Sequence, residues 1–361
     1  MTAFPKDCTA CVQDLWRYVR GSIVRVMRLV LHGQSSFAHW LTASSCTPYE
    51  ERSGKQVLKD CEPVPESVSF LEGLFPYLPQ PYHVTVLERN KAPLPEAVSH
   101  ISVYRYSPRI FCKIESGVYA SCPELCLTQL ASSLTLHELI LAASVLCGIY
   151  RRNPLDGALE KRLPLTTRAK ILAFLQRNPR IHGSKKVREA VRWVTEKAAS
   201  PPEAVLAMML RLPFRLGGFQ LEGFKVNCRI EPSRRARAIA GRSTLVPDIL
   251  FSEARLALEY DSTAEHTSAQ QLTLDAKKRS ALEADGYKVV TVTARQMQNA
   301  EEMRKVALQV YKRLGLRFRP RCSDFGERQQ AVIGVGRMLD RFFRDCERGE
   351  AVQRCSECAS R

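Results

Sequence analysis

The sequence predicts an α+β fold, in which a small α+β module and connecting helices precede a C-terminal core with the order helix, three strands, helix, strand. Capping and stop signals mark the two helices of that core. Short runs rich in apolar and β-branched residues predict its strands. These runs lie near residues 224–230, 245–251, 256–262 and 287–293.

Capping residues define the helices of the core. Ser200 is the expected N-cap of the first helix, with proline in the first turn and Glu203 at the third position. Ser268 is the expected cap of the second helix, which ends before Gly286 because glycine readily adopts the backbone conformation that stops a helix. The core with its closing elements therefore spans residues 200–320.

The 361 residues are enough for two or three folded parts. Upstream of the core, alternating strands and two capping boxes, Ser121-Cys-Pro-Glu124 and Thr135-Leu-His-Glu138, predict a compact module. The polar stretch Arg151 to Pro164 predicts a linker. The expected parts are an N-terminal helix with an irregular segment (35–78), the small α+β module, a linker with helices, the core, and a C-terminal helix or tail, at residues 1–80, 81–150, 151–199, 200–320 and 321–361.

The positive charge of the chain favours a polyanionic partner. The formal net charge is +17 at pH 7, and each phosphate that a lysine or arginine neutralises releases condensed counterions. Six bases cluster in one Arg-rich stretch, which predicts a flexible loop that contacts the phosphates of DNA; a solvated linker is the alternative. The six are Lys225, Arg229, Arg234, Arg235, Arg237 and Arg242.

Cysteine usage and hydropathy predict a cytoplasmic protein without a membrane segment. The 13 cysteines are scattered, and two Cys-x-x-Cys pairs, Cys8/Cys11 and Cys355/Cys358, lie at opposite ends of the chain. A shared zinc site requires those ends to meet, so we do not expect one. Three cysteines fall on apolar helical faces, which predicts that they are buried: Cys122, Cys126 and Cys147.

Three acidic residues on two neighbouring strands form the candidate site. Side-chain alternation in the run from Leu256 places Glu259 and Asp261 on one face of a strand, and Asp248 follows Pro247 in the preceding strand. Two carboxylates about 4 Å apart repel by roughly 4 kcal/mol at an effective dielectric constant near 20. A bound proton or a cation removes this repulsion. Carboxylate oxygens on rigid strands suit Mg²⁺ or Mn²⁺.

This order of elements and motifs resembles the PD-(D/E)XK nuclease superfamily, and more narrowly the very-short-patch-repair (Vsr)-like endonuclease domains of uncharacterised actinobacterial proteins. The resemblance covers residues 183–320 and implies a restriction-endonuclease-like core. Residues 80–150 also resemble, more weakly, the AbiEi antitoxin-like half of those proteins, which implies a protein partner in a defence or toxin–antitoxin-like system. The matching core residues are Ser200, Glu203, Asp248, Glu259, Tyr260, Asp261, Ser262, His266, Asp275, Arg279, Leu282 and Gly286.

The resemblance implies a metal centre on the acidic strands. Asp248 and Glu259 are expected to hold Mg²⁺ or Mn²⁺, with the backbone carbonyl of Tyr260 as a further ligand. Glu203 is expected to face the same site from the first helix. The metal then serves as Lewis acid and water activator for phosphodiester hydrolysis.

The resemblance also implies groups that handle protons and the phosphate. His266 is expected to orient or deprotonate the attacking water. Either Lys278 or Arg279 is expected to face the scissile phosphate. The lysine that the superfamily carries after Glu-x is Asp261 here, which leaves the general base unassigned. Ser262 also stands where many such domains have glycine.

Structural alternatives stand beside several of these roles. Glu203 is also correctly placed as the capping-box partner of Ser200. Asp275 and Arg279 are four residues apart on a helix, a spacing that favours a structural ion pair over a catalytic couple. His266 has the alternative of an exposed loop residue.

Two functions therefore compete. The first is a Mg²⁺-dependent DNA endonuclease or nickase, acting alone or within a defence or mobile-element system. The second is a catalytically silent protein with a nuclease fold that binds DNA or a protein partner, as an antitoxin-like regulator does. The strong positive charge disfavours a purely structural role. Because fold and function are separable, the choice depends on the site itself.

Overall fold

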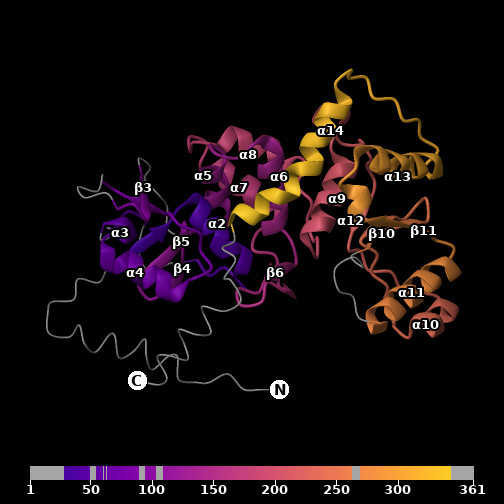
Figure 1. Ribbon diagram of the computed structural model, residues 1–361, viewed down its shortest axis with the longest axis horizontal. Coiled ribbons are helices and arrows are strands. Elements are labelled where there is room, and N and C mark those ends of the chain that lie inside the picture. Colours follow the sequence, from indigo (N-terminus) through magenta and orange to yellow (C-terminus); the bar gives the residue numbers. More distant parts are fainter. Residues whose placement is uncertain are drawn as a thin grey trace. The chain divides into compact units, whose positions relative to one another are not determined.

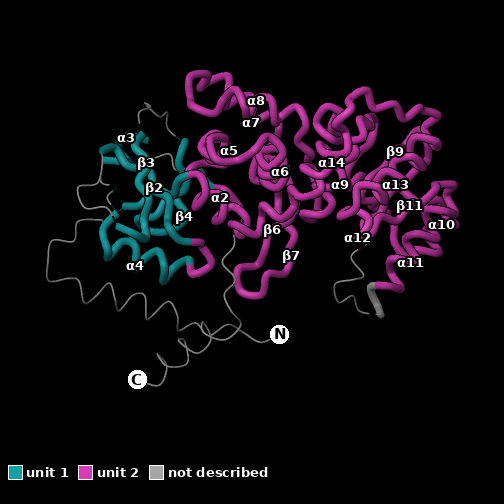
Figure 2. Tube along the Cα trace, turned by 45° about the horizontal axis from the view of Figure 1, so that its top comes forward, with its two compact units in different colours: residues 1–32, 47–75, 80–120 teal, residues 33–46, 76–79, 121–361 magenta. Residues whose placement is uncertain are grey.

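The computed structural model describes residues 28–48, 54–59, 61, 63–88, 94–102, 109–261 and 269–342 (Figure 1). It is a mixed α+β protein, as predicted. The chain divides into two compact units (Figure 2), with residues 1–32, 47–75 and 80–120 in the first and residues 33–46, 76–79 and 121–361 in the second. None of the helices in the described ranges is long and apolar enough to cross a membrane. Both Cys-x-x-Cys pairs and most of the predicted N-terminal helix lie outside the described residues.

The first unit is built on a five-stranded sheet in the order β3-β2-β1-β5-β4. β1 is parallel to β5 and antiparallel to β2, and β2 is parallel to β3. Two short helices, α3 and α4, belong to the same unit. The bounds are β1 Leu29–Leu31, α3 Gly54–Leu58, α4 Pro65–Leu74, β2 Tyr82–Val86, β3 Ala97–Ile101, β4 Phe111–Glu115 and β5 Val118–Ser121.

The segment 35–78 was predicted to be irregular, and this prediction is wrong. It contains α3, α4 and most of α2 (Gly33–Thr42). Pro65 is the first residue of α4, a position at which the missing N–H donor of proline costs nothing. The hydroxyl of Ser67 accepts a hydrogen bond from the backbone of Val64 at 2.9 Å. The proline and serine residues that indicated a loop are therefore, at α4, the start signals of a helix.

Helices form most of the second unit before the core. The capping box predicted at Ser121 is wrong, because α5 has Cys122 as its N-cap and that side chain makes no capping hydrogen bond. The box at Thr135 is confirmed: its backbone N–H donates to Glu138 Oε2 at 2.7 Å. Cys122, Cys126 and Cys147 are buried, as predicted. The elements are α5 Pro123–Leu130, α6 Leu136–Leu146, β6 Tyr150–Arg152, β7 Leu159–Lys161, α7 Arg168–Arg177 and α8 Ser184–Val191.

The core has the predicted element order with two additional helical elements, the 3₁₀ helix η1 (Phe214–Leu216) and helix α10. Its four strands form a sheet in the order β11-β10-β9-β8, in which β10 is parallel to β11 and antiparallel to β9. Ser200 caps α9 by accepting a hydrogen bond from Glu203 N, as predicted. The bounds are α9 Pro201–Arg211, β8 Lys225–Val226, α10 Arg234–Ala240, β9 Ile249–Phe251, β10 Leu256–Asp261, α11 Ala269–Ala284 and β11 Lys288–Thr293.

The Arg-rich stretch 225–242 was predicted to be a flexible loop, but residues 234–240 of it form α10. Ser233 caps this helix by accepting a hydrogen bond from Ala236 N at 3.2 Å, and Gly241 ends it with a φ of 64°. α10 packs against α11 (Figure 1), with Ala236 and Ala240 in one buried cluster with Leu282. The alanines between the arginines thus anchor a helix, which fixes the direction of the charged side chains.

Further helices follow β11 and complete the second unit. Phe342, at the end of the last one, packs edge to face against Phe37 of α2, with the ring centroids 4.9 Å apart. The C-terminal part, which was predicted to be a helix or a tail, is therefore helical as far as the structure describes it. These elements are α12 Ala294–Met297, α13 Ala300–Arg313, α14 Phe325–Ile333 and the 3₁₀ helix η2 Gly334–Phe342.

Candidate active site

Asp248 and Glu259 lie next to each other on neighbouring strands. The antiparallel register pairs Ile249 of β9 with Leu258 of β10, which places the preceding Asp248 beside Glu259. Asp248 Oδ2 accepts a hydrogen bond from the backbone N–H of Tyr260 at 2.7 Å. The two acidic side chains are 16% and 15% exposed. The structure thus brings two of the predicted acidic residues together in a largely buried position.

A lysine from helix α11 faces both carboxylates. Lys278 Nζ lies 2.5 Å from Glu259 Oε2 and 3.8 Å from Asp248 Oδ1, and its side chain is 23% exposed. Of the two bases that the sequence offered for this place, Lys278 is the one at the carboxylates, whereas Arg279 is exposed on the helix. The ammonium group at the carboxylates therefore comes from a helix, whereas strand β10 ends with Asp261.

Burial disfavours the charged form of both carboxyl groups. The pKa of Asp248 is raised to about 8. Burial is the largest cause and repulsion from Glu259 the second, whereas Lys278 lowers the pKa. Burial also raises the pKa of Glu259, and Lys278 again opposes the shift. At neutral pH a proton and the Lys278 ammonium group therefore balance the charge of the pair. A metal ion has to compete with both of them.

The donor atoms of the pair fit a hard divalent cation. Glu259 Oε1 is buried and has no hydrogen-bond partner among the described residues. Two carboxylates suffice for Mg²⁺, which usually completes its shell with waters and substrate phosphate. No cluster of three or more His, Cys, Asp or Glu side chains in the described ranges is arranged to hold a metal. The pair therefore suits a metal that binds together with a phosphate, once Lys278 has moved aside.

Glu203 lies near the pair, but hydrogen bonds occupy its carboxylate. Oε2 accepts from Ala199 N at 2.8 Å and from Asn227 Nδ2 at 2.6 Å, and Oε1 accepts from the hydroxyl of Ser200 at 2.9 Å. Glu203 therefore has a structural role at the start of α9, although its carboxylate binds the backbone of Ala199 and the hydroxyl of Ser200 and not the backbone N–H of Ser200 that a capping box uses. Its charge still reaches the site, because it contributes to the raised pKa of Asp248.

Asn227 connects these parts and was missed by the sequence analysis. Its backbone N–H donates to the carbonyl of Asp248 at 3.0 Å, while its side chain binds Glu203 Oε2 and, at 2.9 Å, the carbonyl of Lys197. Its φ of 47° lies in the left-handed region, which asparagine tolerates better than most residues. An asparagine directly after a strand was the available signal, although it does not by itself indicate a site.

Other predicted residues are placed less closely. Asp261 is half-buried at the end of β10. His266 and Ser262 lie outside the described residues. Tyr260 contributes its amide to Asp248, and the role of its carbonyl as a metal ligand stays a prediction. Residues predicted to contact DNA are all exposed: Lys225, Arg229, Arg234, Arg235, Arg237, Arg242 and Arg279.

Comparisons with known proteins identify no relative of this chain. No protein-family model, no curated protein and no solved structure matches the chain significantly. Membership of the PD-(D/E)XK superfamily and of its Vsr-like branch therefore stays a prediction, as does the AbiEi-like character of residues 80–150.

Proposed function

We propose that this protein is a metal-dependent DNA endonuclease or nickase that hydrolyses phosphodiester bonds. The observation that supports this most is the pair Asp248 and Glu259, held side by side on two strands with Lys278 directly opposite. Two carboxylates and a lysine around one point are the groups that phosphodiester hydrolysis with a divalent cation requires.

In this proposal Asp248 and Glu259 hold Mg²⁺ or Mn²⁺. The metal supplies Lewis acidity toward the phosphate and lowers the pKa of a bound water. Because the pKa of Asp248 is raised, this carboxyl group would have to release its proton in order to hold the cation. Glu203 and Asn227 position the backbone at Asp248. One hydrogen bond joins the side chains of Glu203 and Asn227, and another joins the backbone N–H of Asn227 to the carbonyl of Asp248.

Lys278 takes the part that the strand lysine plays in the resembling nucleases. Its ammonium group is 2.5 Å from Glu259 in the absence of substrate. When a phosphate enters, the ammonium group moves from the carboxylate to a phosphate oxygen and stabilises the negative charge that develops there. Asp261, at the strand position, has no positive charge to offer, so this step depends on α11.

DNA is the proposed substrate because the exposed bases and the net charge of +17 favour a polyanion. Helix α10 presents Arg234, Arg235 and Arg237 from a fixed backbone, which orients them better than a loop. A cytoplasmic setting and a protein partner in a defence or toxin–antitoxin-like system belong to the same proposal and follow from the predicted resemblance.

One observation favours the second candidate, a catalytically silent DNA-binding or antitoxin-like regulatory protein. Lys278 Nζ already neutralises Glu259 and lies near Asp248, so an internal cation stands where the metal has to bind. In this reading the lysine and one proton stabilise the buried carboxyl groups permanently. The basic surface then binds nucleic acid without cutting it.

Supercoiled plasmid separates these two candidates. The wild-type protein is expected to nick or linearise it with Mg²⁺ or Mn²⁺ and to leave it intact in EDTA, and Asp248→Ala and Glu259→Ala are expected to abolish cutting. Glu253→Gln is a matched control, because Glu253 is an exposed acid in the turn between β9 and β10. Salt-sensitive DNA binding without cutting at any metal concentration supports the silent protein instead.

A further inference from the structure

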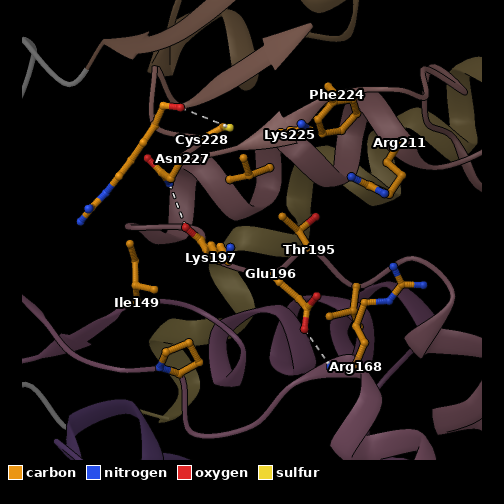
Figure 3. A pocket seen from close by; sticks show the side chains of 14 residues that line it. Ile149, Arg168, Thr195, Glu196, Lys197, Arg211, Phe224, Lys225, Asn227 and Cys228 are labelled. Carbon is orange, nitrogen blue, oxygen red and sulfur yellow. Dashed lines mark hydrogen bonds between the residues drawn. The ribbon is translucent and has the colours of Figure 1, made fainter. Parts of the chain in front are cut away.

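A second polar site lies in the second unit, on the open edge of the core sheet. A cavity of about 690 Å³ is bounded on one side by residues 194–197 and on the other by β8 and the residues after it (Figure 3). β8 is the last strand of the sheet. The cavity is therefore formed by the core together with the helical part that precedes it.

The walls of this cavity carry five cations and one acid. The carboxylate of the acid, Glu196, accepts a hydrogen bond from the backbone N–H of Arg168 at 2.9 Å. The positive charge of the wall thus exceeds its negative charge by a wide margin. The cations are Arg168, Lys197, Arg211, Lys225 and Arg229.

Arg211 is the most constrained of these cations. Its guanidinium group lies over the ring of Phe224, 4.6 Å from the centroid, and its Nε is buried with no hydrogen-bond partner among the described residues. Burial lowers its pKa, repulsion from Arg168 lowers it further, and attraction to Glu222 opposes the shift as the smallest of the three causes. Arg168 is itself held in place, since its Nε donates to the carbonyl of Val191 at 3.1 Å. Two fixed guanidinium groups therefore repel each other across one cavity.

A neutral polar group in the same wall is also left without a partner. Thr195 is 1% exposed, and within the described ranges its hydroxyl makes no hydrogen bond. Unsatisfied buried polar atoms are uncommon in folded proteins, and each one calls for an explanation. An anion in the cavity would offset the repulsion between the two arginines.

The cavity and the carboxylate pair share a wall. Asn227 lines the cavity, and the same residue binds Glu203 through its side chain and the carbonyl of Asp248 through its backbone. Lys225 and Arg229, which flank Asn227, also line the cavity. A ligand in the cavity therefore contacts the segment around Asn227, and this segment positions Asp248.

We propose that this cavity binds the phosphodiester backbone of a nucleic-acid strand at a distance from the scissile bond, which lies at Asp248 and Glu259. Arg168 and Arg211 both bind one phosphate of that backbone. The inference rests on the proposed function, because it assigns a backbone contact to the substrate of that site. A phosphate suits the two arginines, because a planar guanidinium group can donate two parallel hydrogen bonds to two phosphate oxygens. The overall charge of +17 favours nucleic acid over an acidic peptide as the source of that phosphate.

Fluorescence anisotropy with a short labelled DNA duplex, and with its single strand, tests this inference. The protein carries Glu259→Gln and the buffer contains EDTA, so cutting plays no part. Arg211→Gln is expected to weaken binding about tenfold and to make the slope of log K against log salt less negative by about 0.7–0.9, the loss of one phosphate contact. Arg304→Gln is the matched control, because Arg304 is exposed and lies 5.3 Å over the ring of Phe318.

Equal effects of Arg211→Gln and Arg304→Gln on DNA binding overturn the inference. It is also overturned if a poly-glutamate peptide of equal charge binds as tightly as DNA and its binding is weakened equally by Arg211→Gln. If Arg211→Gln fails to fold, the exposed pair Lys225→Gln/Arg229→Gln is compared with Lys312→Gln/Arg304→Gln by the same criterion. DNA binding that depends on Arg211 in a protein that never cuts keeps this site and removes the nuclease.

Discussion

Two partly buried clusters of ionisable side chains lie on neighbouring strands of different sheets, and they differ in how they accommodate the loss of water. In the core, Asp248 and Glu259 face Lys278. In the first unit, three histidines from β2, β3 and the end of β1 lie together. His83 Nδ1 and His100 Nε2 are 2.8 Å apart, and the ring of His32 stacks on His100 with centroids 3.9 Å apart: the cluster is His32, His83 and His100.

The histidines become neutral and use one another as partners. Burial, with mutual repulsion as the smaller cause, lowers the pKa of His32 to about 2 and that of His100 to about 4. His32 Nδ1 also lies 3.1 Å from the hydroxyl of Thr85. The three rings therefore contact one another as neutral groups and need no charged partner.

The carboxylates are different because neutralising them takes a proton and a cation from another element of the fold. Lys278 supplies that cation, and Glu259 Oε1 is left with no partner in the described part of the chain. The comparison shows that burial of titratable groups does not by itself indicate a functional site. The carboxylate pair differs from the histidines because its own members cannot neutralise its charge. This property indicates that the candidate functional site is in the core.

The largest expected effect separates two acids of β10. Glu259→Ala is expected to lower the rate of plasmid nicking by about 1000-fold, because a metal contributes several kcal/mol of transition-state stabilisation and 1.36 kcal/mol corresponds to a factor of ten. Asp261→Ala is expected to lower it by less than about tenfold, since Asp261 lies beyond the lysine-bound pair. Equal losses in nicking assays would show that the ligand set is wrong.

The next effect concerns the lysine. Lys278→Met is expected to lower kcat for nicking by about 10- to 100-fold, because an ammonium group no longer stabilises the phosphate. Lys278→Arg is expected to recover part of this loss, since the charge returns with a different shape. The exposed neighbour provides the control: Arg279→Met should change nicking by less than a few-fold. A Lys278→Met protein with full activity contradicts the role given to this residue.

The smallest effect is on stability, and it has opposite signs in the two clusters. Asp248 has a raised pKa in the folded state, so the unfolded state binds fewer protons and stability falls as pH rises from about 4 to about 8. Asp248→Asn is expected to remove this loss and to raise the unfolding temperature at pH 8 by a few degrees. The corresponding free energy is on the order of 1 kcal/mol for each 2–4 °C.

The histidine cluster has a lowered pKa in the folded state, so it loses stability as pH falls from 6.5 toward 4. His100→Gln should weaken that acid dependence. Hydrogen exchange measured by mass spectrometry, peptide by peptide, reports each sheet separately. Exchange is compared as protection relative to the intrinsic rate at each pH, because the intrinsic rate itself rises with pH. Lower protection of the β2 and β3 peptides at high pH than at low pH, or lower protection of the β9 and β10 peptides at low pH than at high pH, contradicts the assigned directions.

Much of the core was predictable because local signals agreed with the global fold. Ser200 caps α9, Gly286 ends α11 with a φ of 79°, and the acidic strands pair as expected. The pairing of Asp248 with Glu259 followed from strand adjacency. The partner Lys278 was among the candidates, although only the packing of α11 on the sheet distinguishes it from Arg279.

The rest depended on contacts that local patterns do not contain. Helix α10 is stable because Ala236 and Ala240 pack on α11, a tertiary contact, and the sequence alone presented only a run of arginines. Pro65 indicated a break and in fact begins a helix. Asn227 and Arg211 acquire their roles from residues far away in the sequence. Side chains whose importance comes from partners in other elements cannot be recognised from their own neighbours.

Binding of Mn²⁺, measured by calorimetry or electron paramagnetic resonance, tests most directly whether the carboxylate pair is a cation site. We predict that the wild-type protein binds one ion, that Glu259→Gln weakens this binding at least about tenfold, and that Lys278→Met strengthens it, because the competing ammonium group is gone. Equal binding by all three proteins, or none by any of them, contradicts the account.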